Sequence, residues 1–204
     1  LANLYFREKI ENEVHYYKYL GFKKNPVVLR TLLSGQRHYE IPCSEAGLLF
    51  GDKDASLNIT AFLSLHCSHC ARAFEKIKNI LSSEDKVSIK VFLVTSDKKI
   101  LNTLYHYNNN GKENEALDLL DQWFNADPYS RSRVSDALCI PDADDISNEV
   151  SDEIHRLFKE YNVAGTPTFF INGYKLPRQY DIDNIKYFQE VFKDEALMEK
   201  DVVK

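Results

Sequence analysis

Two periodicities of apolar residues along the chain predict its core elements. Residues 58–65 and 86–94 are apolar on both faces, which is typical of strands in the interior of a sheet. From Cys67 to Leu81 the apolar positions are instead spaced by three and four residues, so we expect a helix to begin at or near Cys67. A crossover through this helix would make the two strands parallel.

The second half of the chain changes pattern twice. Residues 97–161 are helical in pattern, with breaks of turn composition at NNNGK, DPYS and IPDADD. Residues 168–171 then predict a strand, Asn172-Gly173 predicts a hairpin turn, and the residues up to Pro177 predict a second strand, antiparallel to the first. A final amphipathic helix is expected from Ile182 to Phe192.

The N-terminal part has helical spacing with interruptions. Residues 3–34 predict two helices broken at Gly21 and at Asn25-Pro26, or a linker that folds only against a parent protein. HYEIP (38–42) and GLLFG (47–51) are short extended candidates. The complete order predicts an α/β thioredoxin fold, in which a mixed sheet is flanked by helices, with an inserted helical subdomain and N-terminal helices. We predict the following boundaries: an N-terminal helical connector at 1–44, the core at 45–96 and 162–194, and the inserted subdomain at 97–161.

Composition narrows the classes of function. The 204 residues carry a net charge of −5 and no basic stripe interleaved with aromatic residues, so nucleic acid is a poor candidate for a partner. No apolar run approaches the ~20 residues that span a bilayer. The chain begins at Leu1 without the features of a signal peptide, and its only methionine is Met198. We interpret it as a processed protein or as a domain of a longer polypeptide.

The cysteines of CSHC, Cys67 and Cys70, are the strongest candidates for chemistry. A c-type haem site needs histidine directly after the second cysteine, where this chain has Ala71. A structural zinc site needs four ligands, and Cys43 and Cys139 are distant in sequence, so the spacing does not favour a metal. Two simply buried thiols are a weaker alternative, because a cysteine at a helix N-terminus is exposed.

A redox role uses every feature of the CSHC motif. The nucleophile in disulfide exchange is a thiolate. At a helix N-terminus, free N–H groups and the positive end of the helix dipole would stabilise the ionised sulfur of Cys67. His69 can add a hydrogen bond or a positive charge to the same sulfur, and Cys70 lies one turn along, near enough to close a disulfide. Because a stabilised thiolate makes the disulfide a stronger oxidant, His69 favours an oxidising centre.

The sequence VAGTPTFFING (163–173) strengthens the redox interpretation. Thr166-Pro167, directly before a strand, matches the cis-proline loop that faces the active-site disulfide in thioredoxin-like folds. A cis bond is unusual even before proline. It would leave the backbone of Thr166 free to pair with an extended substrate strand. An ordinary trans proline at the opening of a strand is the alternative.

These motifs resemble the thioredoxin superfamily, in particular its DsbA-like and protein-disulfide-isomerase-like branch. CSHC follows an apolar strand. GTPTFFINGYKLP comes later in the chain, after an interval long enough to hold a helical insertion. Residues 45–190 also resemble the thioredoxin-like domain fused to bacterial vitamin K epoxide reductase homologues. That narrower resemblance rests on GDKDA (51–55), the Trp123-Phe124 helix and NGYKLPRQYDIDNIKYF (172–188).

The resemblance implies a protein disulfide oxidoreductase with no cofactor beyond its redox-active disulfide. Cys67 would be the exposed nucleophile, Cys70 the resolving thiol and His69 the tuning residue, while clients would be bound by Ser68, Thr166 and Pro167. It also implies oxidation of protein thiols in the bacterial periplasm. Electrons would then pass to a quinone-linked membrane domain of the vitamin K epoxide reductase type, in the same polypeptide or another.

Three points stay open in the sequence. Ala61 stands where thioredoxin and DsbA have a buried carboxylate, so the usual proton acceptor for Cys70 is missing. Threonine before the proline also occurs in isomerase-type members, so a reductase or isomerase is an alternative, as is a peptide-binding or zinc-bound domain with incidental cysteines. Cys43 and Cys139 are candidates for a second disulfide, with separate buried thiols as the alternative.

Overall fold

The chain folds as two compact units. The computed structural model describes residues 2–41, 46–84, 86–140 and 145–192. One unit, here called the sheet unit, is His38–Leu176, and the other, the terminal unit, combines Leu1–Arg37 with Pro177–Lys204.

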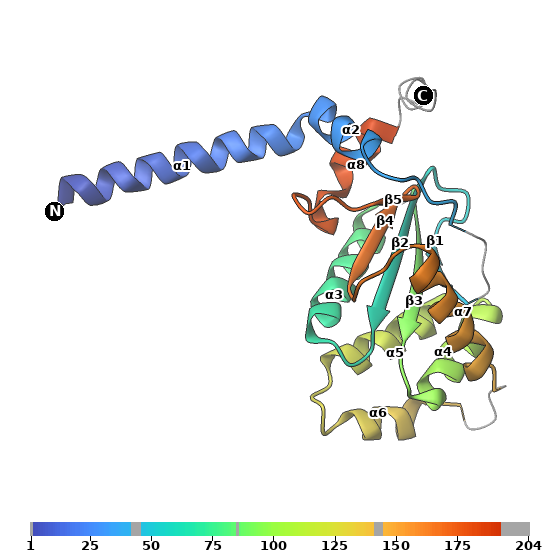
Figure 1. Ribbon diagram of the computed structural model, residues 1–204. Coiled ribbons are helices and arrows are strands. Elements are labelled where there is room, and N and C mark those ends of the chain that lie inside the picture. Colours follow the sequence, from blue (N-terminus) through green and yellow to red (C-terminus); the bar gives the residue numbers. More distant parts are fainter. Residues whose placement is uncertain (1, 42–45, 85, 141–144, 193–204) are drawn as a thin grey trace. The chain divides into compact units, whose positions relative to one another are not determined.

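The sheet unit is built on a mixed five-stranded sheet with the strand order β1-β3-β2-β4-β5 (Figure 1). β2 and β3 are parallel, and the other neighbouring strands are antiparallel, which confirms the sheet expected from the sequence. The bounds of the strands are β1 Leu48–Gly51, β2 Leu57–Ser64, β3 Val87–Val94, β4 Thr168–Ile171 and β5 Tyr174–Lys175.

Helices pack on this sheet, and four of the described helices come from the stretch of sequence between β3 and β4. The predicted crossover helix is α3, Ser68–Ser83, which joins the parallel strands β2 and β3. The helical insertion is also confirmed and consists of α4 Lys98–Asn109, α5 Glu113–Asn125, α6 Arg131–Leu138 and α7 Ser147–Glu160. In Figure 1 the C-terminal ends of β2 and β3 point toward α5. No helix in the described part of the chain combines the length and apolar character that crossing a bilayer requires.

An aromatic cluster fills the core behind the central strand. Phe62 of β2 stacks on Phe92 of β3 with ring centroids 5.0 Å apart, and it meets Phe158 of α7 edge-on at 5.2 Å. Phe170 of β4 approaches the same ring at 6.0 Å. Side chains on both faces of β2 are buried between helices, which explains why the strand is apolar at nearly every position.

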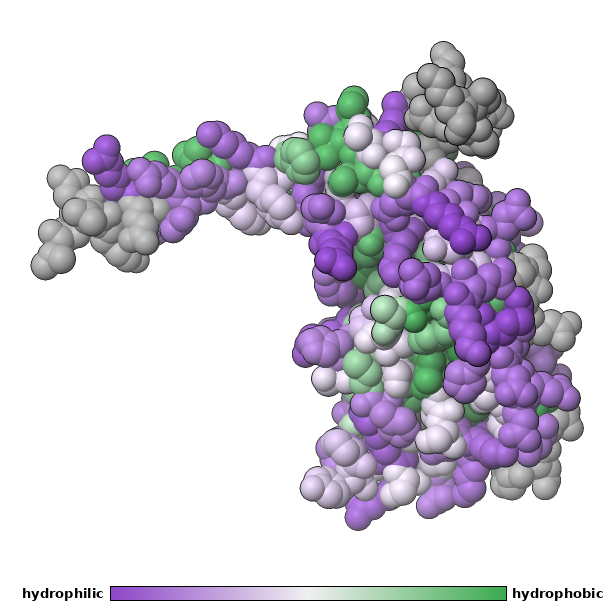
Figure 2. Space-filling view, in the orientation of Figure 1, coloured by the Kyte–Doolittle hydropathy of each residue, from purple (hydrophilic) through white to green (hydrophobic). Residues whose placement is uncertain are grey.

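The terminal unit is helical. Its elements are α1 Ala2–Lys24, α2 Pro26–Ser34, the 3₁₀ turn η1 Ile182–Asn184 and α8 Ile185–Phe192. The predicted break at Gly21 is wrong, because α1 continues through it; one glycine costs a helix only about 1 kcal/mol relative to alanine. The break before Pro26 is confirmed, with the side chain of Asn25 accepting a 2.9 Å hydrogen bond from the N–H of Val27. Apolar patches are visible along α1 and α2 in Figure 2.

The two short extended candidates behave differently. GLLFG contains strand β1, whereas HYEIP contributes only an isolated bridge between His38 and Tyr174 within its described residues. Nε2 of His38 lies 3.1 Å from the carbonyl oxygen of Asn172, and the N–H of Tyr39 donates to the carbonyl of Gly173 at 2.9 Å. The start of the sheet unit is thereby attached to the β4–β5 hairpin.

Replacing Phe62 with alanine tests the aromatic cluster. Its side chain is fully buried, so Phe62→Ala should lower the free energy of unfolding by about 3–5 kcal/mol, measured by denaturant titration. Tyr129→Ala is the control, because Tyr129 is 93% exposed and its loss should change the free energy by less than about 0.5 kcal/mol. Equal effects of the two variants would contradict this description of the core.

Candidate active site

The register of β4 against β2 brings the two sequence motifs together. Thr168, the first residue of β4, pairs with Phe62 near the end of antiparallel β2. The residues that precede β4 therefore lie beyond the C-terminal end of β2, where the chain turns into α3. The Thr166–Pro167 peptide bond is cis, as the sequence predicts.

Cys67 occupies the N-cap position of α3. Its backbone is extended (φ −102°, ψ 122°), and the helix begins at the next residue. Its half-buried thiol donates a hydrogen bond to the carbonyl oxygen of Thr166, with 3.8 Å between sulfur and oxygen. The cysteine motif and the proline loop, distant in sequence, thus meet at one sulfur atom.

The surroundings of Cys67 favour its ionised form. Burial acts to raise the pKa of this thiol, but several effects together outweigh it and hold the pKa below the ordinary value. In order of size they are hydrogen bonds from the backbone N–H of Cys70, from the thiol of Cys70 and from the backbone N–H of His69, and then the positive charge of Arg72. The two N–H groups belong to the first turn of α3, where helix N–H groups have no partner within the helix.

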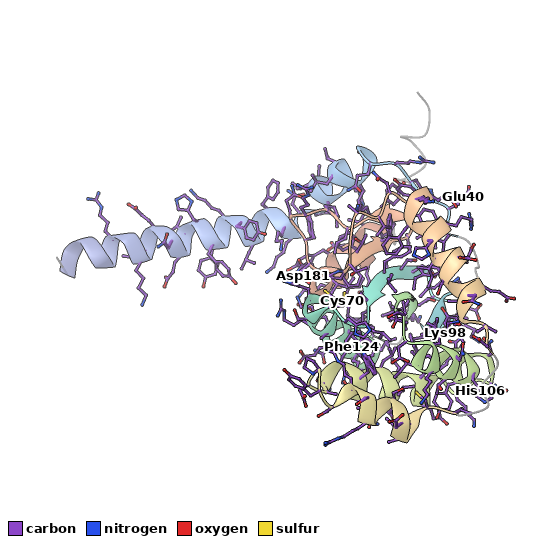
Figure 3. All side chains as sticks on the ribbon, turned by 60° about the horizontal axis from the view of Figure 1, so that its bottom comes forward. Glu40, Cys70, Lys98, His106, Phe124 and Asp181 are labelled. Atoms are coloured by element: carbon purple, nitrogen blue, oxygen red, sulfur yellow. The ribbon has the colours of Figure 1, made fainter. Side chains whose placement is uncertain are left out.

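Cys70 differs from Cys67 in both burial and pKa. Its side chain is fully buried on the core-facing side of α3, and Figure 3 shows it beside α5, which carries Phe124. Burial raises the pKa of Cys70 to about 11, even though hydrogen bonds from the N–H of Ser64 (3.3 Å) and from the side chain of Thr166 favour its thiolate. Both sulfurs are free thiols in this structure.

No carboxylate is among the groups that affect the pKa of Cys70. Ala61, where the sequence suggested a missing acid, is fully buried in β2 opposite Phe169. The hydroxyl of Thr166 and the thiol of Cys67 are the side-chain groups that hydrogen-bond to Cys70, and either can exchange a proton with it. Sequence reasoning assigned Thr166 only to client binding, and its contact with Cys70 is an addition to that role.

His69 and Ser68 are exposed in the first turn of α3. Nδ1 of His69 lies 2.8 Å from a terminal nitrogen of Arg72. Because a guanidinium can only donate hydrogen bonds, Nδ1 is the acceptor in this contact. Arg72 is a residue that the sequence interpretation missed; the available signal was its position three residues after His69, which places the two side chains on one face of the helix. A tuning role for His69 and a binding role for Ser68 stay predictions.

Trp123 connects the helical insertion to the cysteine loop. Its buried ring belongs to the core, and its Nε1–H donates to the carbonyl of Leu65 at 2.9 Å. On the loop side, the exposed His66 meets this ring edge-on at 5.8 Å between centroids. The guanidinium of Arg131 lies 5.6 Å from the centre of the same ring.

Cys43 and Cys139 are the remaining predicted residues. Cys139 is a half-buried free thiol whose sulfur lies 3.7 Å from the hydroxyl oxygen of Ser135. Its proposed partner Cys43 lies outside the described residues, so the second disulfide stays a prediction. Nowhere in the described ranges do three or more His, Cys, Asp or Glu side chains converge as metal ligands do.

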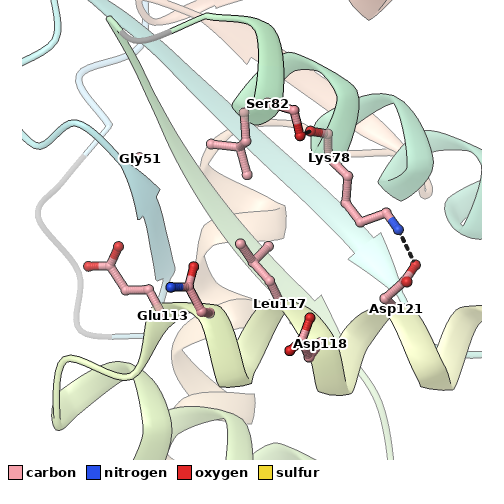
Figure 4. A pocket seen from close by; sticks show the side chains of 9 residues that line it. Gly51, Lys78, Ser82, Glu113, Leu117, Asp118 and Asp121 are labelled. Atoms are coloured by element: carbon pink, nitrogen blue, oxygen red, sulfur yellow. Dashed lines mark hydrogen bonds and ion pairs between the residues drawn. The ribbon is translucent and has the colours of Figure 1, made fainter.

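A cavity of about 590 Å³ lies between α3 and α5, and none of its lining residues is a cysteine (Figure 4). Asp121 and Lys78 form an ion pair across it, and Glu113 and Asp118 also contribute to its lining. The cavity is therefore separate from the cysteine pair and rich in carboxylates.

Comparison with known proteins agrees with this geometry. The family model described as thioredoxin matches residues 44–188. The chain belongs to the thioredoxin family. No curated protein matches the sequence. As a member of that family, the chain carries the cysteine pair of a thiol–disulfide oxidoreductase in the place where the fold requires it.

Solved structures share the fold at low sequence identity. The catalytic domain of ScsC from Proteus mirabilis is similar at a TM-score of 0.60 and 18% identity, covering 74% of this chain and 92% of that one. BdbD from Bacillus subtilis is similar at a TM-score of 0.58 and 14% sequence identity, and the match covers 78% of this chain and 97% of BdbD. A periplasmic thioredoxin-like protein from Salmonella enterica serovar Typhimurium is similar at a TM-score of 0.59 and 16% sequence identity. The match covers 74% of this chain and 93% of that protein.

Titration of the reduced protein should separate the two thiols. Because the pKa of Cys67 is lowered, its ultraviolet thiolate signal should appear below the ordinary thiol range, whereas Cys70 should ionise near pH 11. The reaction of the reduced protein with a small disulfide should therefore accelerate as pH rises through the Cys67 pKa and then level off. Cys67→Ser should remove the first ionisation. Two thiols that ionise together near pH 8.5, as free cysteine does, would contradict this assignment.

Thr166→Val tests the hydroxyl next to Cys70. Loss of this hydrogen bond should raise the pKa of Cys70 further, because the bond favours the thiolate. Attack of Cys70 on a mixed disulfide at Cys67 should then slow, measured in stopped-flow single turnovers. Thr166→Ser is the matched control, since it keeps the hydroxyl. Equal rates for the valine and serine variants would show that the hydroxyl has no part in the step.

Proposed function

We propose that this chain oxidises paired cysteines of client proteins in the bacterial periplasm. The observation that carries the proposal is the difference between its two thiols. One sulfur is half-exposed at a helix N-terminus with a lowered pKa, and the other is buried with a pKa of about 11. Stabilising the thiolate of Cys67 stabilises the reduced form of the pair. The disulfide form therefore tends to accept electrons from client thiols.

The reaction begins with the Cys67–Cys70 disulfide. A client thiolate attacks the sulfur of Cys67, the bond to Cys70 breaks, and the electron pair moves to the sulfur of Cys70. That sulfur takes up a proton, because a group with a pKa of about 11 does not stay ionised at neutral pH. The second client thiolate then attacks the client sulfur of the mixed disulfide. Cys67 leaves as a thiolate, and two electrons have passed from the client to the protein.

The lowered pKa of Cys67 acts on the second half of this sequence. In thiol–disulfide exchange the thiolate with the lower pKa is the better leaving group. The helix N–H groups that stabilise Cys67 therefore accelerate release of the oxidised client. Cys67 is also the sulfur that a client can attack first, because it is half-exposed and Cys70 is fully buried.

The loop before β4 offers a place for the client backbone. Within the described chain, the N–H of Thr166 donates to no other backbone or side-chain group. It lies next to the carbonyl that faces the sulfur of Cys67. An extended client segment can pair with this free N–H and so present its cysteine to Cys67.

The compartment and the electron acceptor are proposed from similarity to other proteins. The periplasm is supported by the similarity to the periplasmic thioredoxin-like protein of Salmonella enterica, and oxidation in that compartment suits a disulfide-based enzyme. A membrane domain of the vitamin K epoxide reductase type is our proposed acceptor for electrons from the reduced pair. That partner rests on the sequence resemblance of residues 45–190 alone.

Cysteine variants test the proposed reaction directly. Cys67→Ser should lose all exchange with a reduced model protein, because without Cys67 the disulfide that receives the attack cannot form and Cys70 is fully buried. Cys70→Ser should keep a reactive Cys67 and accumulate mixed disulfides, visible by mass spectrometry of the intact protein. Cys139→Ser is the control and should exchange at the unaltered rate. Full activity in Cys67→Ser would refute the proposal.

A further inference from the structure

Charges are separated along the paired helices α3 and α5. At the cysteine end, Arg72 lies on α3. Arg131, the first residue of α6, lies over the ring of Trp123, which is near the C-terminal end of α5. Toward the other end, α5 presents Glu113, Asp118 and Asp121 to the cavity between the two helices, and α3 contributes Lys78. We call Arg72 and Arg131 the arginine rim.

A series of contacts connects the rim to the reactive sulfur. Arg72 contributes a positive charge that acts on Cys67, and its guanidinium holds His69 at 2.8 Å. Arg131 lies over Trp123, and Trp123 contacts His66, the residue directly before Cys67. Arg72 therefore lies within electrostatic reach of Cys67, and Arg131 is connected to the same loop through Trp123 and His66.

Neither arginine has a carboxylate partner among the described residues. Glu75, three positions after Arg72 on α3, forms no ion pair with it there. The carboxylate closest in sequence to Arg131, that of Asp127, accepts hydrogen bonds from the hydroxyl of Ser130 at 2.5 Å and from the N–H of Tyr129 at 2.9 Å. The Nε atom of Arg131 is buried without a hydrogen-bond partner in the described chain. The rim thus keeps its capacity to bind an anion.

We propose that the arginine rim selects client cysteines that are flanked by acidic side chains. The inference rests on the proposed function, since it names the clients of the same site. A carboxylate on the client would form charge-assisted hydrogen bonds with Arg72 or Arg131 while the client cysteine reaches Cys67. The histidines at 66 and 69 add further donors at the same surface.

The net negative charge of the chain means that a preference for acidic clients can arise only close to the arginine rim. The net charge of the chain is −5, so its average field repels acidic peptides. A preference for acidic clients therefore has to arise at the rim itself, within about a Debye length of Cys67. It should weaken as salt is added, because Arg72 is solvent-exposed and Arg131 is half-exposed, and salt screens charges at such positions.

Matched dithiol peptides provide the test. Three peptides of identical sequence would carry glutamate, glutamine or lysine on each side of one cysteine, and each would be mixed with the disulfide form of the complete chain. We expect the glutamate peptide to exchange roughly three- to tenfold faster than the lysine peptide at low salt, with the ratio approaching one at high salt. The ratio is the readout, because any change in the reactivity of Cys67 affects all three peptides alike.

Arginine variants assign the preference to residues. Arg72→Gln and Arg131→Gln should each reduce the glutamate-to-lysine ratio by roughly two- to threefold. Arg133→Gln is the matched control: it removes the same charge from an exposed position on α6, two residues from Arg131 and hence on a different face of that helix. This variant should leave the ratio unaltered.

Three outcomes would count against the inference. Equal rates for the glutamate and lysine peptides would overturn it, as would a ratio that survives both rim substitutions or that falls equally in Arg133→Gln. If the glutamine peptide exchanges normally in these cases, the proposed function stands and only the client preference fails. If none of the peptides reacts with the protein, the proposed function fails first.

Discussion

The junction between β2 and α3 is the constraint on which the site depends. β2 is held in the middle of the sheet by pairing with β3 on one side and β4 on the other, so its C-terminal end has a fixed position. The chain leaves that end and starts α3 one residue after Cys67. Cys67 thereby receives the free N–H groups of the first helical turn, while the same sheet register places Thr166 against its sulfur. Acidity and client access arise from one piece of backbone geometry.

The two cysteines differ because one helical turn carries Cys70 from solvent to core. Its buried sulfur sits between the N–H of Ser64 and the hydroxyl of Thr166, without an acid nearby in the described structure. This arrangement brings one residue of the proline loop to both sulfurs. The backbone carbonyl of Thr166 faces Cys67, and its side chain hydrogen-bonds to Cys70.

The sequence predicts the parts of the site that local patterns determine. The change of period at Cys67, the two apolar strands and the Asn172-Gly173 turn specify the fold, and Thr166-Pro167 specifies the loop. Gly21 misleads, because a long helix tolerates one glycine where proline ends it. The contacts of Arg131 and His66 with Trp123 could not be predicted, since they join residues that meet only when the insertion packs against the sheet unit. The hydrogen bond between Arg72 and His69 is local, but their spacing alone does not distinguish it from an ordinary solvated helix face.

The reduction potential of the Cys67–Cys70 pair tests the central claim most directly. Equilibration of the protein with glutathione buffers, followed by quantification of the free thiols, gives this value. If the helix N-terminus stabilises the Cys67 thiolate as described, the potential should lie closer to the value of about −120 mV for DsbA than to the value of about −270 mV for thioredoxin. A potential near that of thioredoxin would contradict the account and would indicate that the chain donates electrons to its clients.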